Sequence, residues 1–336
     1  MIYIPNNIKQ LTIGKGARLL KMEKCNFNSF EVSGFKVIGA GDETCIEIHN
    51  CIFGDQLWVR DNSFQNISGR AIQVSMCRNA SVYNNKVDGT RMNALFCTGW
   101  NVSVWKNELR NIGYMSQTMA LTISGNDIHV FENIIEDFNY SGISTGSDPS
   151  CIIERNIIRF TPGFLKNHQN ITLADGGGIY VSPWVKNCII RYNVIDNLSG
   201  TGANRGIFLD DGGKNLVIYG NLVMNTHNCY DIDLRLCRTY AKQLPDHNTN
   251  NIVFGNIMTG GYRFEDKGAG SHCRGGENIL MGIGKWQKST TKINGYKQDI
   301  TLDGCSYSKG KLTVPRKYAA IMEGLDPFVK KYISVR

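Results

Sequence analysis

The sequence predicts an all-β fold, a right-handed parallel β-helix in which short strands wind coil upon coil. Three observations predict it: a repeat of about two dozen residues, strand-like alternation inside each repeat, and a composition rich in turn residues. The chain has 336 residues, of which 36 are Gly and only 7 are Pro. Gly and Asn, which recurs throughout, tolerate the positive φ angles that tight turns between short strands require.

An Asn that opens a short apolar pair marks the repeat. The markers are Asn62, Asn85, Asn107, Asn133, Asn156, Asn193, Asn221 and Asn256, at spacings of 23, 22, 26, 23, 37, 28 and 35 residues. Six residues before most of them lies a second polar turn residue: Asn79, Asn101, Asp127, Ser150, Asn187, Asn215 and Asn250. We expect Asn at these bends because it adopts the left-handed conformation and because stacked Asn side chains can hydrogen-bond from coil to coil.

The segments between the markers alternate at period 2 and are too short for helices, so one side of each faces a core. The predicted inward column reads Ile72, Leu95, Leu121, Ile143, Ile179, Ile207 and Ile232, and two residues further on Val74, Cys97, Ile123, Thr145, Val181, Leu209 and Leu234. The predicted outward columns read Gln73, Phe96, Thr122, Ser144, Tyr180, Phe208 and Asp233, and then Ser75, Thr98, Ser124, Gly146, Ser182, Asp210 and Arg235. In the following coil, Arg263 and Glu265 continue them outward.

We expect two parts: coils over residues 1–281, with no visible N-terminal cap, and a basic extension over residues 282–336 that packs on the solenoid. The extension includes a short helical segment after Pro315. It carries most of the net charge of +8, which leaves the coils nearly neutral and weighs against nucleic acid as a partner. No apolar run approaches the roughly 18 residues of a membrane helix, and the first residues show no signal-peptide pattern.

The chain has 11 Cys and no CxxC pair. Cys151 and Cys188 occupy equivalent repeat positions, where we expect stacked core thiols rather than a disulfide or metal ligands. The His residues have no metal-like spacing either, so no metal site and no cofactor are predicted.

Two repeats are longer than the others, through insertions at 160–178 and 237–249. Insertions in a solenoid become loops on one face, often the binding face. The strand between them carries RGIFLDDGG (205–213). We therefore predict a groove that the two loops wall, with acidic side chains on its floor.

Cleavage of a glycosidic bond needs one carboxylic acid and one carboxylate. We predict Asp210 and Asp233 as this pair, because they are diagonal neighbours with Cα atoms about 8 Å apart. That separation favours an inverting mechanism, for which the carboxyl groups lie ~6.5–9.5 Å apart. Asp211 and Glu265 complete the catalytic candidates. Turn chemistry explains the DDGG segment equally well, and an ion-pair ladder through Arg235 explains the neighbouring charges.

Other residues near this strand are candidates for substrate binding: Asp175, Tyr180, Trp184, Arg205, Phe208, Arg235, His247 and Arg263. The aromatic members can stack on sugar rings, or they can pack beneath a loop.

The Asn-marked coils resemble the pectate-lyase-like β-helix superfold over roughly residues 30–281. Within them, DGGGIYV (175–181) and RGIFLDDGG resemble a glycoside hydrolase-type branch whose members carry a GIYLDDG-like strand end, with Phe208 in place of the usual Tyr. The resemblance implies a periplasmic or secreted bacterial enzyme that acts on glycans with paired acids. Carried over, it reaches Asp210 and Asp211, and more loosely Asp175.

Two other functions stay open. A polysaccharide lyase would use a Lys or Arg base, such as Arg235, Arg263 or Lys267, and Ca²⁺ beside a uronate. A non-catalytic adhesin or phage fibre would bind a glycan without turning it over. In each case the expected partner is an oligo- or polysaccharide, and we expect a monomer or a small homo-oligomer.

Overall fold

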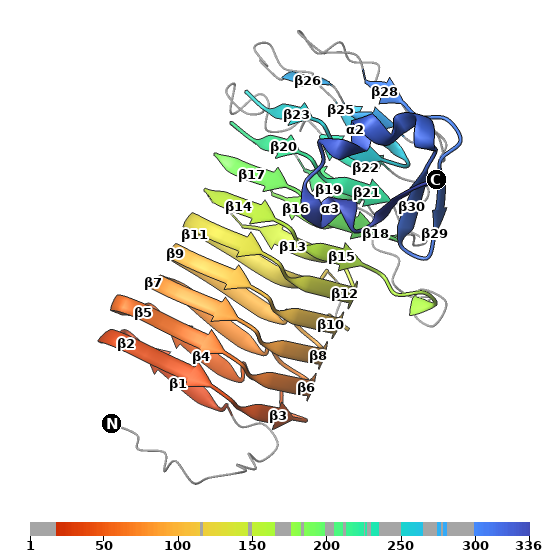
Figure 1. Ribbon diagram of the computed structural model, residues 1–336. Helices are drawn as coiled ribbons and strands as arrows, with labels where there is room; N and C mark the ends of the chain where they lie inside the picture. The colour runs from red at the N-terminus through yellow and green to blue at the C-terminus, as the bar shows by residue number, and fades with distance from the viewer. Residues whose placement is uncertain are drawn as a thin grey trace.

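The computed structural model describes residues 18–114, 117–146, 150–164, 176–182, 185–198, 205–210, 213–224, 226, 230–234, 250–264, 274–276, 278–280 and 299–336. These residues form a parallel β-solenoid, so the predicted fold class is confirmed. Coils stack from β1 near the N-terminus to β28 near the C-terminus (Figure 1). The predicted uncapped start of the chain lies outside the described residues.

Each complete coil adds one strand to each of three faces. The first face contains β1 (Leu20–Glu23), β4 (Ile46–His49), β7 (Ile72–Tyr83), β9 (Leu95–Trp105), β11 (Met119–Phe131), β13 (Ser141–Thr145), β16 (Gly177–Val181), β19 (Arg205–Leu209), β22 (Tyr230–Leu234) and β25 (Gly261–Phe264). The second face contains β2 (Asn26–Ser33), β5 (Ile52–Arg60), the second halves of β7, β9 and β11, and then β14 (Cys151–Glu154), β17 (Cys188–Arg191), β20 (Val217–Tyr219), β23 (Ile252–Phe254) and β26 (Arg274–Gly276). The third face contains β3 (Lys36–Ile38), β6 (Ser63–Ile67), β8 (Lys86–Thr90), β10 (Glu108–Ile112), β12 (Ile134–Phe138), β15 (Ile157–Arg159), β18 (Val194–Asp196), β21 (Leu222–Met224), β24 (Ile257–Met258), β27 (Ile279–Leu280) and β28 (Ile300–Thr301).

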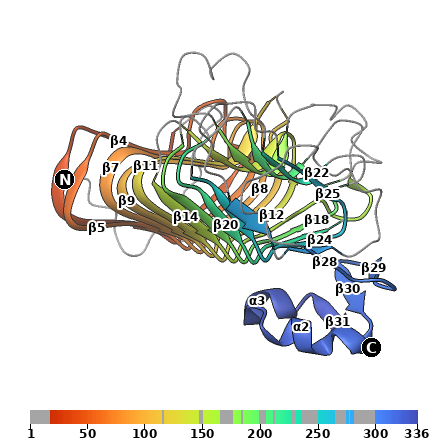
Figure 2. The same cartoon turned by 90° about the horizontal axis from the view of Figure 1, so that it is seen from above.

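The first and second faces belong to one sheet because three long strands run around the corner between them. The first half of β7 pairs with β4, and its second half pairs with β5. The view from above shows the coils nearly superposed (Figure 2). Each described pairing between coils on the three faces is parallel, so a residue lies directly over its equivalent one repeat earlier.

The core follows the predicted inward columns. Ile143 pairs with Ile179, Ile179 with Ile207, and Ile207 with Ile232, and all four are fully buried in one cluster. Burial of such a side chain contributes roughly 1.5–3 kcal/mol. A column of branched apolar residues therefore helps to fix the register of these four coils.

The Asn markers form a buried hydrogen-bonded ladder. The side-chain amide of Asn156 donates to Oδ1 of Asn193 (3.0 Å), and Oδ1 of Asn156 accepts from the backbone N–H of Asn133 (3.0 Å). The same contacts link the other members: Asn62, Asn85, Asn107, Asn221, Asn256 and Asn278. The stacking that the sequence predicts is confirmed.

The left-handed conformation does not lie at these markers. It lies at the residue before each of them, as at Lys106 (φ 52°), Glu132 (φ 57°) and Tyr192 (φ 57°). The expectation is correct for six of the seven upstream turn residues, as at Asn79 and Asn101 with φ 55°, and Ser150 is the exception. Asn is needed at each marker because its side-chain amide both donates and accepts hydrogen bonds inside the buried wall. The backbone φ angle of the marker sets no such requirement.

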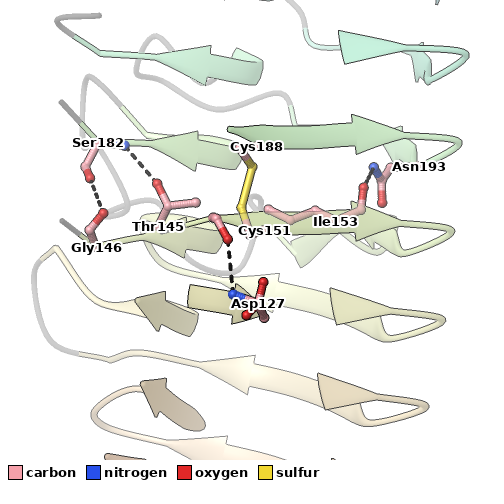
Figure 3. Close-up of a disulfide and its surroundings, with 9 residues drawn as sticks. Asp127, Thr145, Gly146, Cys151, Ile153, Ser182, Cys188 and Asn193 are labelled. Atoms are coloured by element: carbon pink, nitrogen blue, oxygen red, sulfur yellow. Dashed lines mark hydrogen bonds between the residues drawn. A yellow bond between two sulfur atoms is a disulfide. The ribbon is translucent and has the colours of Figure 1, made fainter. Parts of the chain in front are cut away.

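Cys151 and Cys188 form a disulfide between adjacent coils, and their Cα atoms are 4.7 Å apart (Figure 3). The expectation of two separate thiols at these positions is therefore wrong. Parallel register brings equivalent residues to a Cα separation inside the range for disulfides, so two stacked Cys can bond without moving the backbone. The other described Cys are free thiols: Cys25, Cys45, Cys51, Cys77, Cys97 and Cys305.

The C-terminal segment lies against the outside of the solenoid (Figure 2). It contains β29 (Ser306–Ser308), β30 (Lys311–Val314), the 3-10 turn η1 (Arg316–Tyr318), α2 (Ala319–Glu323), α3 (Pro327–Lys330) and β31 (Ile333–Val335). Leu312, Val314 and Met322 pack with Leu222 and Ile257 of the third face in a second apolar cluster. The segment therefore covers an apolar part of the outer side of that face.

Candidate functional site

The predicted outward column of the first face is in register. Tyr180 pairs with Phe208, and Phe208 pairs with Asp233, on β16, β19 and β22. Their chain neighbours Ile179, Ile207 and Ile232 belong to the core, so strand alternation places this column on the outer side. We call Tyr180, Arg205, Phe208, Asp210 and Asp233 the first-face site.

Three of these side chains, those of Arg205, Phe208 and Asp233, are buried although they lie outside the apolar core. Phe208 and Asp233 are both 0% exposed, and Phe208 belongs to neither apolar cluster. This differs from the expectation of an open acidic floor. Alternation determines on which side of a strand a residue lies, but not whether other parts of the chain cover it.

A buried ion pair explains how Asp233 is accommodated. Nε of Arg205 donates to Oδ2 of Asp233 at 2.5 Å, and the two side chains are 5% and 0% exposed. The Arg205 guanidinium also lies 3.9 Å from the ring centroid of Phe208. Burial of a lone charge would be strongly unfavourable, so each member of this pair makes the other tolerable.

Asp210 is the more accessible carboxylate. It follows β19, its backbone N–H donates to the carbonyl of Val181 (3.0 Å), and its side chain is half-buried. The hydroxyl of Tyr180 donates to its Oδ2 at 2.8 Å. A phenol and a carboxylate from adjacent coils therefore meet at one point, where a proton could be transferred to or from a bound molecule.

Tyr140 extends the aromatic part of the site, and sequence reasoning missed it. Its ring lies 5.8 Å from that of Tyr180, which also meets the edge of Phe208 at 5.5 Å. Tyr140 comes directly before β13, whose Ser141 pairs with Gly177 at the start of β16. The signal that could have identified it is its place one residue before an aligned strand.

Asp231 is a second residue that sequence reasoning missed. It lies in the column of Gly142, Gly178 and Gly206, where a Cβ would come within 3 Å of side chains of the third face. Its carboxylate accepts from Oγ1 of Thr226, and burial raises its pKa to about 7. The break in a column of glycines is the signal that could have identified it.

Several predicted residues lie outside the described part of the chain: Asp175, Trp184, Asp211, Arg235, His247 and Glu265, with Lys267 of the lyase hypothesis and most of both long insertions. Arg263 is described in its backbone only, on β25 beside Asp233. Among the described residues, no three His, Cys, Asp or Glu side chains gather as metal ligands. No described helix has the length and apolar character for a membrane span.

Similarity to known proteins agrees with this architecture. The model of the right handed beta helix region matches residues 54–257. No curated protein matches the chain. Among solved structures, XylC in complex with xylose has a TM-score of 0.50 at 11% identity, over 86% of this chain and 56% of XylC.

Two further structures are similar at lower scores. PfbA, a surface adhesin of Streptococcus pneumoniae, has a TM-score of 0.46 at 11% identity, over 81% of this chain and 70% of its own. An alginate lyase from Paenibacillus sp. has a TM-score of 0.28 at 12% identity, over 81% of this chain and 88% of its own. The family match covers most of the coils, and the chain is a member of the right handed beta helix family.

Proposed function

We propose that this protein is a carbohydrate-active enzyme, a glycoside hydrolase that acts on an oligo- or polysaccharide along its first face. The observation that carries the proposal is the contact between Tyr180 and Asp210, at 2.8 Å, beside the buried Arg205–Asp233 pair. Acidic, phenolic and cationic side chains in mutual contact on one face are the kind of arrangement from which acid–base sites are built. In a purely structural outer column, neutral polar residues would be sufficient.

Asp210 is the group that we assign to the scissile bond. It is half-buried, it follows a core strand that holds its backbone in place, and the Tyr180 hydroxyl fixes one of its oxygens. A carboxyl group held in this way can protonate a leaving oxygen or activate water.

Asp233 has a different role in this proposal from the one that its sequence position suggests. It is fully buried and paired with Arg205, so we assign it as a positioning residue for that guanidinium. Hydrolysis needs a second carboxyl group. We assign this role to one of Asp211, Asp175 and Glu265, which follow or precede the aligned strands in the sequence.

Tyr180 and Tyr140 are half-buried and can contact a sugar ring, whereas Phe208 is covered and supports Arg205. Aromatic faces are suited to the apolar side of a pyranose. The fold is compatible with this substrate class, since XylC is a protein of similar fold that holds xylose. Because fold alone does not determine function, the proposal depends on the site.

A lyase that acts on a uronate-containing glycan is the second candidate. The observation in its favour is the register of Arg263 directly beside Asp233, which adds a cationic residue to the same outward column as the site. β-Elimination uses a base near the uronate and a charge that neutralises its carboxylate, often Ca²⁺. We expect periplasmic or extracellular action for either enzyme.

The test is a panel of neutral and uronate-containing glycans incubated with the purified chain. New reducing ends without ultraviolet absorbance support the hydrolase, and an unsaturated, ultraviolet-absorbing product supports the lyase. Glycan binding measured by calorimetry without either product would contradict both and favour an adhesin.

A further inference from the structure

A column of three cysteines runs along the corner between the first and second faces. Cys25, Cys51 and Cys77 occupy the same position in three successive coils, one residue before the paired positions Asn26, Ile52 and Arg78. The backbone N–H of Ile52 donates to the carbonyl of Cys25 (3.0 Å), and that of Arg78 donates to the carbonyl of Cys51 (3.3 Å). The three residues are therefore stacked at the spacing of the coils, about 4.8 Å.

The three thiols also share one side-chain orientation. Each Sγ donates to the carbonyl two residues earlier: Cys25 to Glu23 (3.2 Å), Cys51 to His49 (3.3 Å) and Cys77 to Ser75 (3.3 Å). The residue before each Cys adopts the left-handed conformation, at φ 53°, 51° and 53° for Lys24, Asn50 and Met76. The same turn therefore recurs in three successive coils, and its three sulfur atoms lie in one stacked column.

The column ends at the fourth coil. Gly99 pairs with Cys77, and a Cβ at Gly99 would come within 1.9 Å of the Cys77 carbonyl oxygen. The set is therefore limited to three thiols, and Cys25 at its end is the accessible one, because Cys51 and Cys77 are 0% exposed whereas Cys25 is half-buried.

We propose that Cys25 and Cys51 are a redox modification site, which a small disulfide such as oxidised glutathione converts to a disulfide between the first two described coils. The same molecule already contains this geometry, since Cys151 and Cys188 are in-register neighbours joined by a disulfide (Figure 3). The bond would add a covalent link between the first described coil and the second, which otherwise meet through backbone hydrogen bonds and core contacts.

The reaction proceeds by two exchanges. The Cys25 thiolate attacks one sulfur of oxidised glutathione, forms a mixed disulfide and releases one glutathione thiolate. The Cys51 thiolate then attacks the Cys25 sulfur, forms the intramolecular bond and releases the second glutathione. Two protein thiols are oxidised, one glutathione disulfide is reduced to two glutathione thiols, and the released thiolates take up the two protons.

The exposure of each thiol to the oxidant determines the order of these two exchanges. Burial raises the pKa of Cys51 and raises that of Cys77 to about 11, so neither is a good first nucleophile. Removal of Cys25 should therefore protect the other two from the same oxidant. Cys45, a buried free thiol outside the column, is the internal control.

The experiment uses the full chain in oxidised glutathione at mildly alkaline pH, followed by alkylation in denaturant, non-reducing digestion and mass spectrometry. We expect a Cys25–Cys51 linked peptide in the native protein and in Cys77→Ser. We expect it to be absent in Cys51→Ser, and we expect both remaining thiols of the column to be alkylated in Cys25→Ser.

Three results would overturn the proposal. The first is alkylation of both Cys25 and Cys51 while Cys151–Cys188 is linked. The second is a persistent glutathione adduct on Cys25. The third is a Cys51–Cys77 link that forms equally in Cys25→Ser. Because Cys77→Ser leaves the proposed bond intact, a folding defect in Cys51→Ser does not prevent the test.

Discussion

Two regions of the first face each combine an Arg, a Phe and a polar partner, and the polar partner is neutral in one region and charged in the other. In an early coil Arg70 lies 4.7 Å from the ring centroid of Phe96 and donates to Gln73, which pairs with Phe96. In a later coil Arg205 lies 3.9 Å from the ring of Phe208 and donates to Asp233, which also pairs with that Phe. The polar partner is thus a neutral amide in the same coil as Arg70, and a carboxylate in the coil after Arg205.

The difference shows which columns of side chains can change along the solenoid without loss of the fold. The inward columns are apolar in both regions, because each coil must bury them against the next. The outward column changes from Thr122 and Ser144 to Tyr180 and Phe208 within two coils, without loss of register. Function can therefore vary on the outer side while the core keeps the fold.

The largest effect is expected from substitution of Asp210, because the early coils have no acidic residue at the corresponding position. We expect Asp210→Asn to lower turnover of a glycan substrate by about 10²–10⁴-fold with little change in binding, as loss of a general acid or base does. Asp127→Asn is the control, because neighbouring coils carry Asn79 and Asn101 at the position of this exposed Asp. Steady-state kinetics of both variants measure this loss. Equal activities of the two variants would show that Asp210 takes no part in the reaction.

The next effect separates the two arginines. Arg205→Met removes the cationic partner of the buried Asp233 carboxylate, which should lower the free energy of unfolding by about 3–5 kcal/mol. Arg70→Met removes a hydrogen bond to a neutral partner and should cost about 1 kcal/mol. Urea unfolding of both variants measures the difference, and similar losses would mean that the carboxylate does not distinguish the regions.

The fold was predictable because its signals repeat. The Asn markers and the Ile and Leu columns give the register of the first-face strands from β7 onward, and hence the alignment of Tyr180, Phe208 and Asp233. The burial of Asp233 and its pairing with Arg205 were not predictable, because alternation assigns a residue to one side of a strand but fixes neither its exposure nor its partner in the next coil. The disulfide at Cys151 and Cys188 has the same sequence pattern as the free thiols at Cys51 and Cys77.

A third prediction concerns pH and Asp231, the acid in the glycine column. Its pKa is raised by burial from 3.8 to about 7, so between these values the folded chain keeps a proton that the unfolded chain has released. Stability should therefore fall by about 1.4 kcal/mol for each pH unit over this window, and level off above pH 7. Thermal unfolding at pH 5 and pH 8 measures the change, and Asp231→Asn should remove it. The same slope in that variant would assign the effect to another group.

A fourth prediction concerns the ladder that both regions share. Asn156→Ala removes the acceptor of the Asn133 backbone N–H inside a buried wall and should cost about 2–3 kcal/mol. The substitution Asn107→Ala, in the early coils, should cost the same, because its contacts are the same. Denaturant unfolding compares them, and a much larger loss at either position would show that the ladder is not uniform.

The smallest effect is expected from an exposed ion pair on the third face. Lys86 and Glu108 form an ion pair at 3.3 Å with side chains 64% and 37% exposed. Lys86→Ala should change stability by less than about 0.5 kcal/mol, because water and salt screen such pairs. A larger loss in the same unfolding experiment would show that this pair is more tightly coupled than its exposure indicates.

The most direct measurement is a crystal structure of Asp210→Asn with a glycan that the native protein turns over. We predict the sugar on the outer side of β16 and β19, with the linkage that is cleaved beside residue 210 and a ring against Tyr180. A glycan bound only on the second face or on the C-terminal segment would contradict the assignment of the active centre to the first face.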